Sequence, residues 1–444
     1  MSESKPMSIP EVKKLLKRSK KKVVLQTIEN CLIVLRNDAT LQGAIRQNIL
    51  TDRQDIVKDV GWVRSCTTIT DTDYQYIMHY LEHNYCLNSE KKIQAAVKII
   101  ANENQFHPIR DYLSALRWDG EERLPYVLSK YLGAEPCAYT TEVLKVFMLG
   151  AVSRVFQPGI KFDYMLCLAG GQGAGKSTFF RFLALKYEWF TDDLKRIDKD
   201  DVYLQMQGHW IIEMSEMLAT ANAKSIEEIK SFISRMKETY RTPYDKFPKD
   251  RQRQCVFGGT TNTLSFLPLD RTGNRRFLPV PLHREKADIH LLADEPASRA
   301  YIEQLWAEVM EIYRSGNFSL DLSLEMEEEA ERLRRDFMPE DPKAGMIQAF
   351  LDNYTGKYVC TQLLFKDALK NEFGKPKDWE LKEIGDIMNN AVVGWEKCKN
   401  QRYPEFGTQR SWRRIQNVEP VMEQLEITEN FPVIEDTDLP GEWD

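Results

Sequence analysis

The sequence predicts an α/β fold built on a parallel sheet, with a helical N-terminal domain before it and a small winged-helix-like domain after it. A glycine-rich segment, GGQGAGKS at 170–177, directly follows the apolar run at 164–168, as a loop does that joins a strand to a helix. Strand-like and helix-like runs then alternate to about residue 315, which is typical of parallel α/β sheets. After Pro339 and Pro342, two amphipathic stretches and a hairpin pattern indicate a separate small domain.

Length and composition agree with an ordinary globular chain of several domains, since 444 residues can form two or three cores and 29% of them are charged. The chain starts with a lysine-rich segment and ends with an acidic one. These two segments can take part in nucleic-acid binding, but solvated, disordered ends are an equally good interpretation. The expected segments are a basic arm at 1–22, a helical domain for assembly (a collar) at 23–160, an α/β domain at 161–315, a helical linker at 316–342, a winged-helix-like domain at 343–418 and an acidic tail at 419–444.

Nothing in the sequence indicates a membrane or secreted protein. No apolar run approaches the roughly 18 residues that span a bilayer, and the basic N-terminus has no apolar segment behind it. The eight cysteines are scattered without a CxxC pair, which argues against disulfides and structural zinc. We therefore expect a cytoplasmic protein with no membrane partner. The net charge of −6 does not exclude nucleic acid, because much of the acid lies in the tail after Arg414.

The glycine-rich segment matches GxxxxGK[ST], the phosphate loop of the P-loop NTPase fold. Its glycines let backbone N–H groups surround the phosphates, its lysine neutralises the β- and γ-phosphate oxygens, and its hydroxyl holds Mg²⁺. We therefore expect ATP and Mg²⁺, with Lys176 as a catalytic cation and Ser177 as a metal ligand. The expected nucleotide contacts are Gly170, Gly171, Gln172, Gly173, Ala174, Gly175, Lys176, Ser177 and Thr178.

Polar residues at the ends of later strands can complete a hydrolytic site. The apolar run at 209–212 ends in Glu213, and an acid at the carboxyl edge of an open sheet can serve Mg²⁺ or polarise the attacking water. Glu216 is the second candidate, and a surface acid is the alternative for both. Asn262 follows the strand expected at 255–260 and can hold the water and sense the γ-phosphate, whereas a turn-capping asparagine is the plainer interpretation.

Two adjacent arginines, Arg275 and Arg276, precede the strand expected at 277–281. Guanidinium groups match phosphate oxygens and stabilise transition-state charge when a neighbouring subunit supplies them. An ion pair with a carboxylate of the core is the alternative. We count both arginines among the candidate catalytic residues.

Two basic segments are candidates for DNA binding. The stretch at 240–253 interleaves basic and aromatic residues between two prolines, which suits phosphate contact and base stacking, although a solvated loop has the same composition. The expected C-terminal hairpin is basic like the wing of a winged helix, with a partner-docking module as the alternative. The candidate DNA contacts in these two segments are Arg241, Lys246, Lys249, Arg251, Lys397, Lys399 and Arg413.

The order of these motifs resembles the superfamily 3 helicase branch of the AAA+ ATPases, and more closely the virulence-associated protein E family of phage and pathogenicity-island replication proteins. The phrases that carry the resemblance lie between about residues 104 and 282, or about 40% of the chain. They are HPIRDYL, RWDGEERL, GGQGAGKST, GHWIIEMSE, ETYRTPYDK, GTTN and DRTGNRRFLPV.

The resemblance implies an AAA+-like sheet and a role for each candidate. Lys176 and Ser177 would contact nucleotide and Mg²⁺, and Glu213 would be the Walker B acid. Asn262 would be sensor 1, and Arg275 or Arg276 the arginine finger. Lys224, Lys246, Lys249 and Arg251 lie where such motors place a pore hairpin. The sequence departs from the pattern in two ways, because its acids are three residues apart and because residues 1–100 lack the clustered acids of a primase.

We therefore expect an ATP-dependent DNA helicase or replication-initiation motor of a phage or mobile element. It would hydrolyse ATP at the subunit interfaces of a ring, most simply a hexamer, on single-stranded or forked DNA, and could meet replisome proteins. The first alternative is a nucleotide-dependent DNA-binding scaffold or helicase loader that recognises an origin without unwinding. A small-molecule kinase is the second, and the basic–aromatic insert argues against it.

Overall fold

The computed structural model describes residues 5–194, 197, 202–215, 223–240, 249–263, 265–267, 274–371 and 374–415, with backbone alone at 223–225 and 240. The chain forms two compact units, Met1–Glu340 and Asp341–Asp444. Within the first unit, one hydrophobic core gathers side chains from Val12 to Ala101, and separate cores line the two faces of the central sheet. The N-terminal block at 5–106 is therefore distinct in its packing from the rest of the first unit.

The N-terminal block combines helices with a small sheet that the sequence patterns did not indicate. Its core lies between α2 and α4, whose apolar faces are buried against each other and against the sheet. In the sheet, β1 pairs antiparallel with β2 and parallel with β3. The elements of this block are α1 (Ile9–Leu15), α2 (Ile28–Asn37), β1 (Ile45–Asn48), β2 (Arg53–Ile56), α3 (Asp71–Tyr85), α4 (Glu90–Glu103) and β3 (Gln105–Phe106).

The central sheet is wholly parallel and has the strand order β10-β4-β9-β6-β5. The four strands expected from the sequence are all present within two residues of the predicted bounds, and the short edge strand β5 is additional. The strands of the central sheet are β4 (Met165–Ala169), β5 (Phe190–Thr191), β6 (Ile211–Ser215), β9 (Val256–Thr261) and β10 (Phe277–Pro281).

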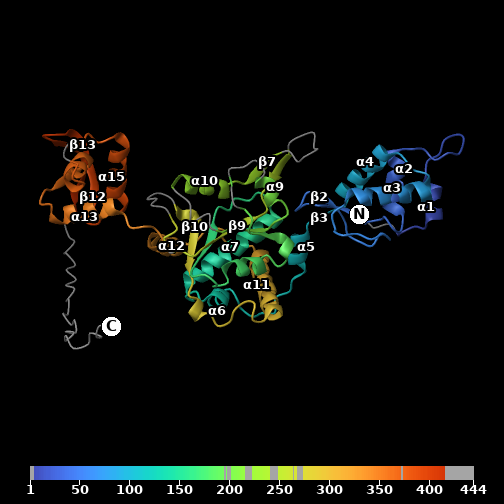
Figure 1. Ribbon diagram of the computed structural model, residues 1–444, viewed down its shortest axis with the longest axis horizontal. Helices are drawn as coiled ribbons and strands as arrows, with labels where there is room; N and C mark the ends of the chain where they lie inside the picture. The colour runs from blue at the N-terminus through green and yellow to red at the C-terminus, as the bar shows by residue number, and fades with distance from the viewer. Residues whose placement is uncertain are drawn as a thin grey trace, which may run out of the picture. The chain divides into compact units, whose positions relative to one another are not determined.

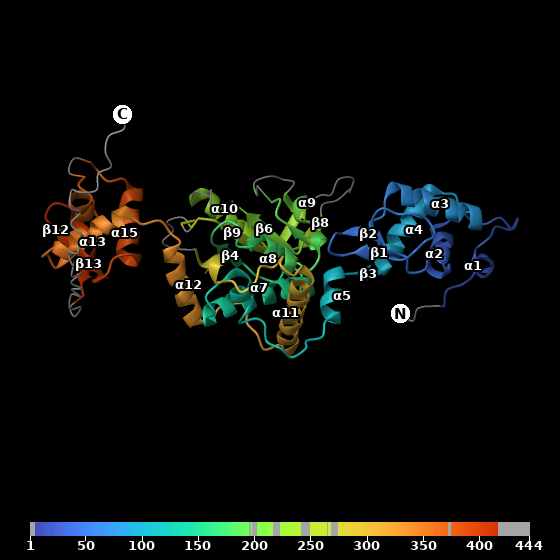
Figure 2. The same cartoon turned by 60° about the horizontal axis from the view of Figure 1, so that its bottom comes forward.

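Helices cover both faces of this sheet (Figures 1 and 2). Side chains alternate between the two faces of each strand, so Leu166 and Leu168 pack with one set of helices, and Met165 and Cys167 with the other. The first face is covered by α7 (Ala138–Phe156), α8 (Lys176–Leu183) and α11 (Glu295–Ser315), and the second by α9 (Val202–Met206) and α10 (Ala223–Ile233). This three-layer α/β arrangement is compatible with a P-loop fold.

The expected helical domain at 23–160 is divided between two cores. Its last helices bury their apolar residues with the sheet, because α7 lies between the sheet and α11 and is buried on nearly every side. A helix that is apolar all round belongs to the centre of a domain rather than to a separate collar. The remaining α-helices and strands described in the first unit are α5 (Pro108–Ala115), α6 (Val127–Leu132), the hairpin β7 (Lys237–Tyr240) and β8 (Lys249–Gln252), and α12 (Leu324–Asp336).

The second unit has its own core, in which Trp412 and Ile387 are almost fully buried. Its order is helix, strand, two helical segments and a hairpin, and the strands form an antiparallel sheet of order β11-β13-β12. The elements are α13 (Pro342–Asn353), β11 (Tyr358–Cys360), α14 (Thr361–Leu363), the π-helical turn η4 (Leu364–Ala368), α15 (Asp378–Asn390), β12 (Trp395–Tyr403) and β13 (Gly407–Arg414). In the part of the chain that the structure describes, no helix has the length and apolar character of a membrane span.

Candidate nucleotide-binding site

The glycine-rich loop joins the end of β4 to the start of α8, as its sequence predicts. Gly173 and Gly175 have φ angles of 79° and 81°, a left-handed conformation that side-chain-bearing residues rarely adopt. A Cβ atom on Gly170 would lie 2.8 Å from the carbonyl oxygen of Leu282, so this glycine allows a close approach of two backbones. The loop and the ends of β6 and β9 line a cavity of about 550 Å³.

Lys176 is the first helical residue after the loop, and its side chain is buried among oxygen atoms. Its Nζ donates hydrogen bonds to the carbonyl oxygens of Gly170 and Gly171, at 2.6 and 2.9 Å, and to Oδ1 of Asn262 at 2.8 Å. Burial lowers the pKa of the Lys176 ammonium, and the negative charge of Glu213 opposes this shift. Lys176 and Asn262, which are 86 positions apart in the sequence, are thus joined by a direct hydrogen bond.

Glu213 lies on β6 and its side chain is completely buried. Oε1 accepts hydrogen bonds from the hydroxyl groups of Ser177, at 2.6 Å, and Thr260, at 2.5 Å. Oε2 is buried and has no hydrogen-bond partner among the described residues. Burial raises the pKa of Glu213, and the two hydroxyl donors counteract part of that rise. A buried carboxylate oxygen with no donor is a position at which a cation or an ordered water belongs.

The groups around Glu213 fit Mg²⁺, which prefers oxygen ligands and usually takes only one or two from the protein. The Ser177 hydroxyl and the unpaired Oε2 of Glu213 are such ligands on adjacent elements. The described residues contain no cluster of three or more metal-binding side chains, so most of the coordination shell would come from phosphates and water. Thr260 was not anticipated, and the only sequence signal for it is its place in the GTTN phrase at the end of β9.

The two adjacent arginines are directed into different environments. Arg276 donates from Nε to the Ser234 hydroxyl at 2.7 Å and forms an ion pair of 3.5 Å with Asp163. An ion pair with a carboxylate of its own chain is the alternative to a catalytic role that the sequence left open. Arg275 is exposed, and its main-chain carbonyl accepts a hydrogen bond from the buried Arg334 at 3.3 Å. Its guanidinium is therefore presented to solvent on an anchored backbone.

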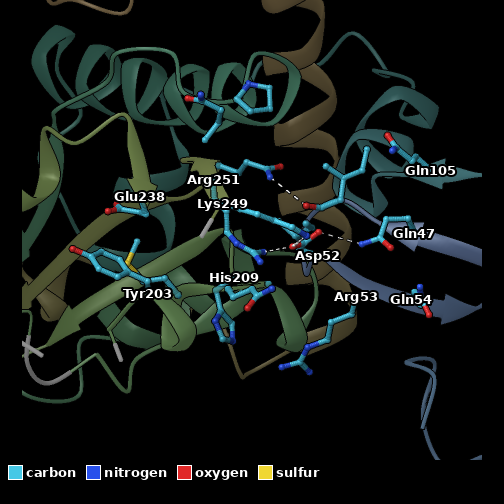
Figure 3. A pocket seen from close by; sticks show the side chains of 18 of the residues that line it. Gln47, Asp52, Arg53, Gln54, Gln105, Tyr203, His209, Glu238, Lys249 and Arg251 are labelled. Carbon is cyan, nitrogen blue, oxygen red and sulfur yellow. Dashed lines mark hydrogen bonds and ion pairs between the residues drawn. The ribbon is translucent and has the colours of Figure 1, made fainter. Parts of the chain in front are cut away.

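Two of the candidate DNA contacts lie on β8 of the β7–β8 hairpin, against the N-terminal block (Figure 3). Asp52, in the turn between β1 and β2, forms an ion pair of 2.5 Å with Arg251 and one of 3.7 Å with Lys249. Beside them, Gln207 donates to the carbonyl of Thr51. Asp52, Gln207, Lys249 and Arg251 line a cavity of about 940 Å³.

The other candidate DNA contacts either have exposed side chains or lie outside the residues that the structure describes. Lys397 and Lys399 are exposed on β12, and Arg413 is exposed on β13 with an ion pair of 2.6 Å to Glu396. The residues that lie outside the described part of the chain are Glu216, Arg241, Lys246 and the side chain of Lys224.

Comparison with known proteins assigns the chain to a family. A family model described as the virulence-associated protein E-like domain matches residues 113–339, which is just over half of the chain. Two A-form apo structures of the NrS-1 C-terminal region are similar to it at 12% sequence identity, with TM-scores of 0.44 and 0.43, over 84% of this chain and 96% of the other. No curated protein matches. The chain belongs to the virulence-associated protein E-like family.

Proposed function

We propose that this protein is an ATP-driven DNA motor, a helicase or replication initiator of a phage or mobile element, that hydrolyses ATP at the interfaces of a ring. One observation carries the proposal. Lys176, Ser177 and Asn262 line one cavity, and direct hydrogen bonds join Lys176 to Asn262 and Ser177 to the buried Glu213 of β6. This is the set of groups that phosphoryl transfer to water requires.

The residues of the chain have separate tasks in hydrolysis. Lys176 exchanges its two carbonyl partners for phosphate oxygens, so the site is preorganised for an anion. Asn262 keeps its Oδ1 on Lys176, which leaves its amide N–H groups to hold the γ-phosphate or the attacking water. Glu213 has one unpaired oxygen, which either polarises the attacking water or holds Mg²⁺. A bound Mg²⁺ would neutralise charge on the β- and γ-phosphate oxygens, and Ser177 and Glu213 are the residues that would hold it.

The position of Arg275 supports a site shared between subunits. Because β10 runs parallel to β4 with Phe277 opposite Met165, Arg275 lies at the edge of the sheet opposite to its own phosphate loop. The loop follows β4 at the other edge, about five strand residues or about 17 Å away. The exposed Arg275 therefore suits a neighbour's nucleotide, whereas Arg276 is held by Asp163 and Ser234. We assign the arginine finger to Arg275.

Two basic regions support DNA as the substrate of the motor. Lys249 and Arg251 lie on β8, the second strand of the β7–β8 hairpin, and the order of elements in the second unit resembles that of a winged helix with β12 and β13 as the wing. The family assignment agrees with a role in replication of mobile DNA. The ion pairs of Asp52 with the hairpin also favour a second candidate, a nucleotide-dependent scaffold or loader that binds DNA without unwinding it.

The decisive experiment compares wild-type protein with Lys176→Ala. We expect ATPase activity that single-stranded DNA stimulates, strand displacement on a forked duplex, and loss of both in the variant, since Lys176 holds the phosphates. Arg276→Ala is the matched control for loss of a cation, because Arg276 is engaged within its own chain. ATP hydrolysis that ignores DNA, in a protein that stays monomeric, would rule out the motor. DNA-stimulated hydrolysis without strand displacement would favour the scaffold.

A further inference from the structure

The segment that follows β10 lies beside the phosphate loop, on the side away from Glu213. In the sheet, β10 is next to β4 on one side, whereas β9 and β6, which carry Asn262 and Glu213, are on the other. Groups that hold the γ-phosphate therefore gather on the β9 side of the loop. The opposite side is formed by 282–290 and by the end of α6.

This segment is held in place by backbone hydrogen bonds at both of its ends. The N–H of Leu282 donates to Ala169, the last residue of β4, at 2.8 Å, and the N–H of Asp288 donates to Lys130 of α6 at 2.9 Å. Between them, a Cβ atom on Gly133 would lie 1.9 Å from the carbonyl oxygen of His283, so the two backbones are in direct contact. The segment is thus a fixed wall rather than a loose loop.

Two polar side chains of the wall lie against the phosphate loop. Nη1 of Arg284 is 2.9 Å from the position that a Cβ atom on Gly173 would occupy, and Nε2 of His290 is 3.7 Å from the corresponding position on Gly175. The apolar side chain of Leu132 lies 3.6 Å from that same position on Gly175. Arg284 is exposed, and within the described part of the chain it has no ion pair, whereas its neighbour Lys286 pairs with Glu135.

We propose that Arg284 binds the nucleoside end of the triphosphate held by its own chain, with its guanidinium plane against the base, and that Leu132 and His290 complete this subsite. The inference rests on the proposed nucleotide binding. A triphosphate whose γ end lies with Lys176, Asn262 and Glu213 must extend its nucleoside toward the opposite side of the loop. The group found there is a planar cation, which stacks on aromatic rings, beside an imidazole and an aliphatic side chain.

The proposed subsite gives separate roles to the two arginines that flank β10, one before the strand and one after it. Arg275 precedes β10 and faces away from its own loop, whereas Arg284 follows β10 and touches it. The first acts on a neighbour's nucleotide and the second on its own. Arg284 therefore contributes to binding and not to the stabilisation of charge at the γ-phosphate.

The test measures the affinity of the full-length protein for ATP and for inorganic tripolyphosphate, which lacks a nucleoside. We expect Arg284→Ala to weaken ATP binding about tenfold and to leave tripolyphosphate binding unchanged. Arg284→Lys should stay weak, because a lysine has no planar fork. Lys286→Ala, a neighbouring exposed cation, is the matched control and should bind both ligands as wild type does.

Steady-state kinetics give an independent readout. Loss of a contact made equally in the ground and transition states raises the KM for ATP about tenfold and leaves kcat unchanged in Arg284→Ala. Parallel loss of ATP and tripolyphosphate, a fall in kcat alone, or full rescue by lysine would each overturn the nucleoside subsite. If wild type binds ATP and Arg284→Ala binds it equally well, only this inference fails. If wild type binds no ATP, the proposed function fails with it.

Discussion

At the scale of single residues, burial sets the chemistry of the site. Glu213 is enclosed by β6, β9 and α8, and its charge is stabilised by two hydroxyl donors and, to a smaller extent, by the positive charge of Lys176. The pKa of Glu213 is raised above its ordinary value of 4.5, chiefly by loss of solvent. Without nucleotide and metal, an ionised Glu213 therefore costs stability, and the same unpaired charge is available to a cation or water when the site is filled.

This leads to a prediction for Glu213→Gln. Because the folded-state pKa is raised, the favourable contribution of the protonated acid is present below the unfolded value of 4.5 and is lost as the pH rises through the folded value. Near pH 8, the nucleotide-free variant should melt at or above the wild-type temperature, with the gap closing as the pH falls toward about 4.5. Thermal unfolding at several pH values measures this.

The same variant should lose ATP hydrolysis by about a hundredfold or more, since an amide cannot accept a proton from water. It should retain ATP binding, because Lys176 and the loop are unchanged. Asp163→Asn serves as the control, a charge removed from a carboxylate that lies outside the cavity. A Glu213→Gln protein that is less stable than wild type by the same margin at every pH would contradict the assignment of its raised pKa to burial.

At the scale of elements, the β1–β2 turn is docked on the β7–β8 hairpin. Asp52 has a left-handed φ of 50°, which aspartate tolerates better than most residues, and its carboxylate forms ion pairs with Lys249 and Arg251. Figure 3 shows these cations reaching Asp52 from the hairpin. The Asp52 carboxylate therefore neutralises positive charge on Lys249 and Arg251 that would otherwise be available to a DNA phosphate.

We predict that Asp52→Asn strengthens binding of single-stranded DNA several-fold at low salt and makes it more dependent on salt. The substitution keeps the size of the side chain and leaves the positive charges of Lys249 and Arg251 less neutralised, so each phosphate contact gains. Fluorescence anisotropy across a range of salt concentrations is the measurement. Asp59→Asn, an equal charge change at another exposed turn of the N-terminal block, should have no effect. Weaker DNA binding in Asp52→Asn would show instead that the ion pairs support the hairpin.

At the scale of the whole molecule, Arg275 and Arg284 lie at opposite ends of β10, so in the proposed ring each copy would supply the loop of one hydrolytic site and the finger of the next. Arg275 is exposed on a backbone held by Arg334, which is itself buried and paired with Glu327. An exposed side chain on a backbone held in this way is available to a second copy. The proposed ring would use this position, at the start of β10, to complete the site of a neighbouring copy.

A mixing experiment tests this division of roles. Subunits with Lys176→Ala bind no nucleotide but present a normal Arg275, and subunits with Arg275→Ala bind nucleotide but present none. Each is expected to be inactive alone, and a mixture should recover part of the DNA-stimulated ATPase activity, because some interfaces then combine an intact loop with an intact finger. The same mixture made with Arg276→Ala in place of Arg275→Ala is the control. If Arg276→Ala alone is inactive and Arg275→Ala alone is active, the finger has been assigned to the wrong residue.

The glycine-rich loop and the main strands could be predicted from the sequence because their signals are local. GGQGAGKS specifies a tight loop through its glycines, and the runs that became β4, β6, β9 and β10 are short, apolar and bounded by polar residues. Glu213 and Asn262 were found as candidates because they stand at the ends of such runs. The short strands β1, β2 and β3 carry too few residues for a periodic signal, and their pairing depends on distant partners.

By itself, then, the sequence determined that the chain holds a glycine-rich loop between a strand and a helix of a parallel α/β sheet, since those features depend on residue types at fixed short spacings. Only the tertiary structure decided that α7 belongs to the core of that sheet, that Arg276 is engaged while Arg275 is exposed, and that Thr260 and Arg284 lie at the site. Each of these depends on contacts between residues far apart in the chain, such as Arg284 against Gly173. Packing decides such contacts, because a side chain takes the partners that the neighbouring elements bring within its reach.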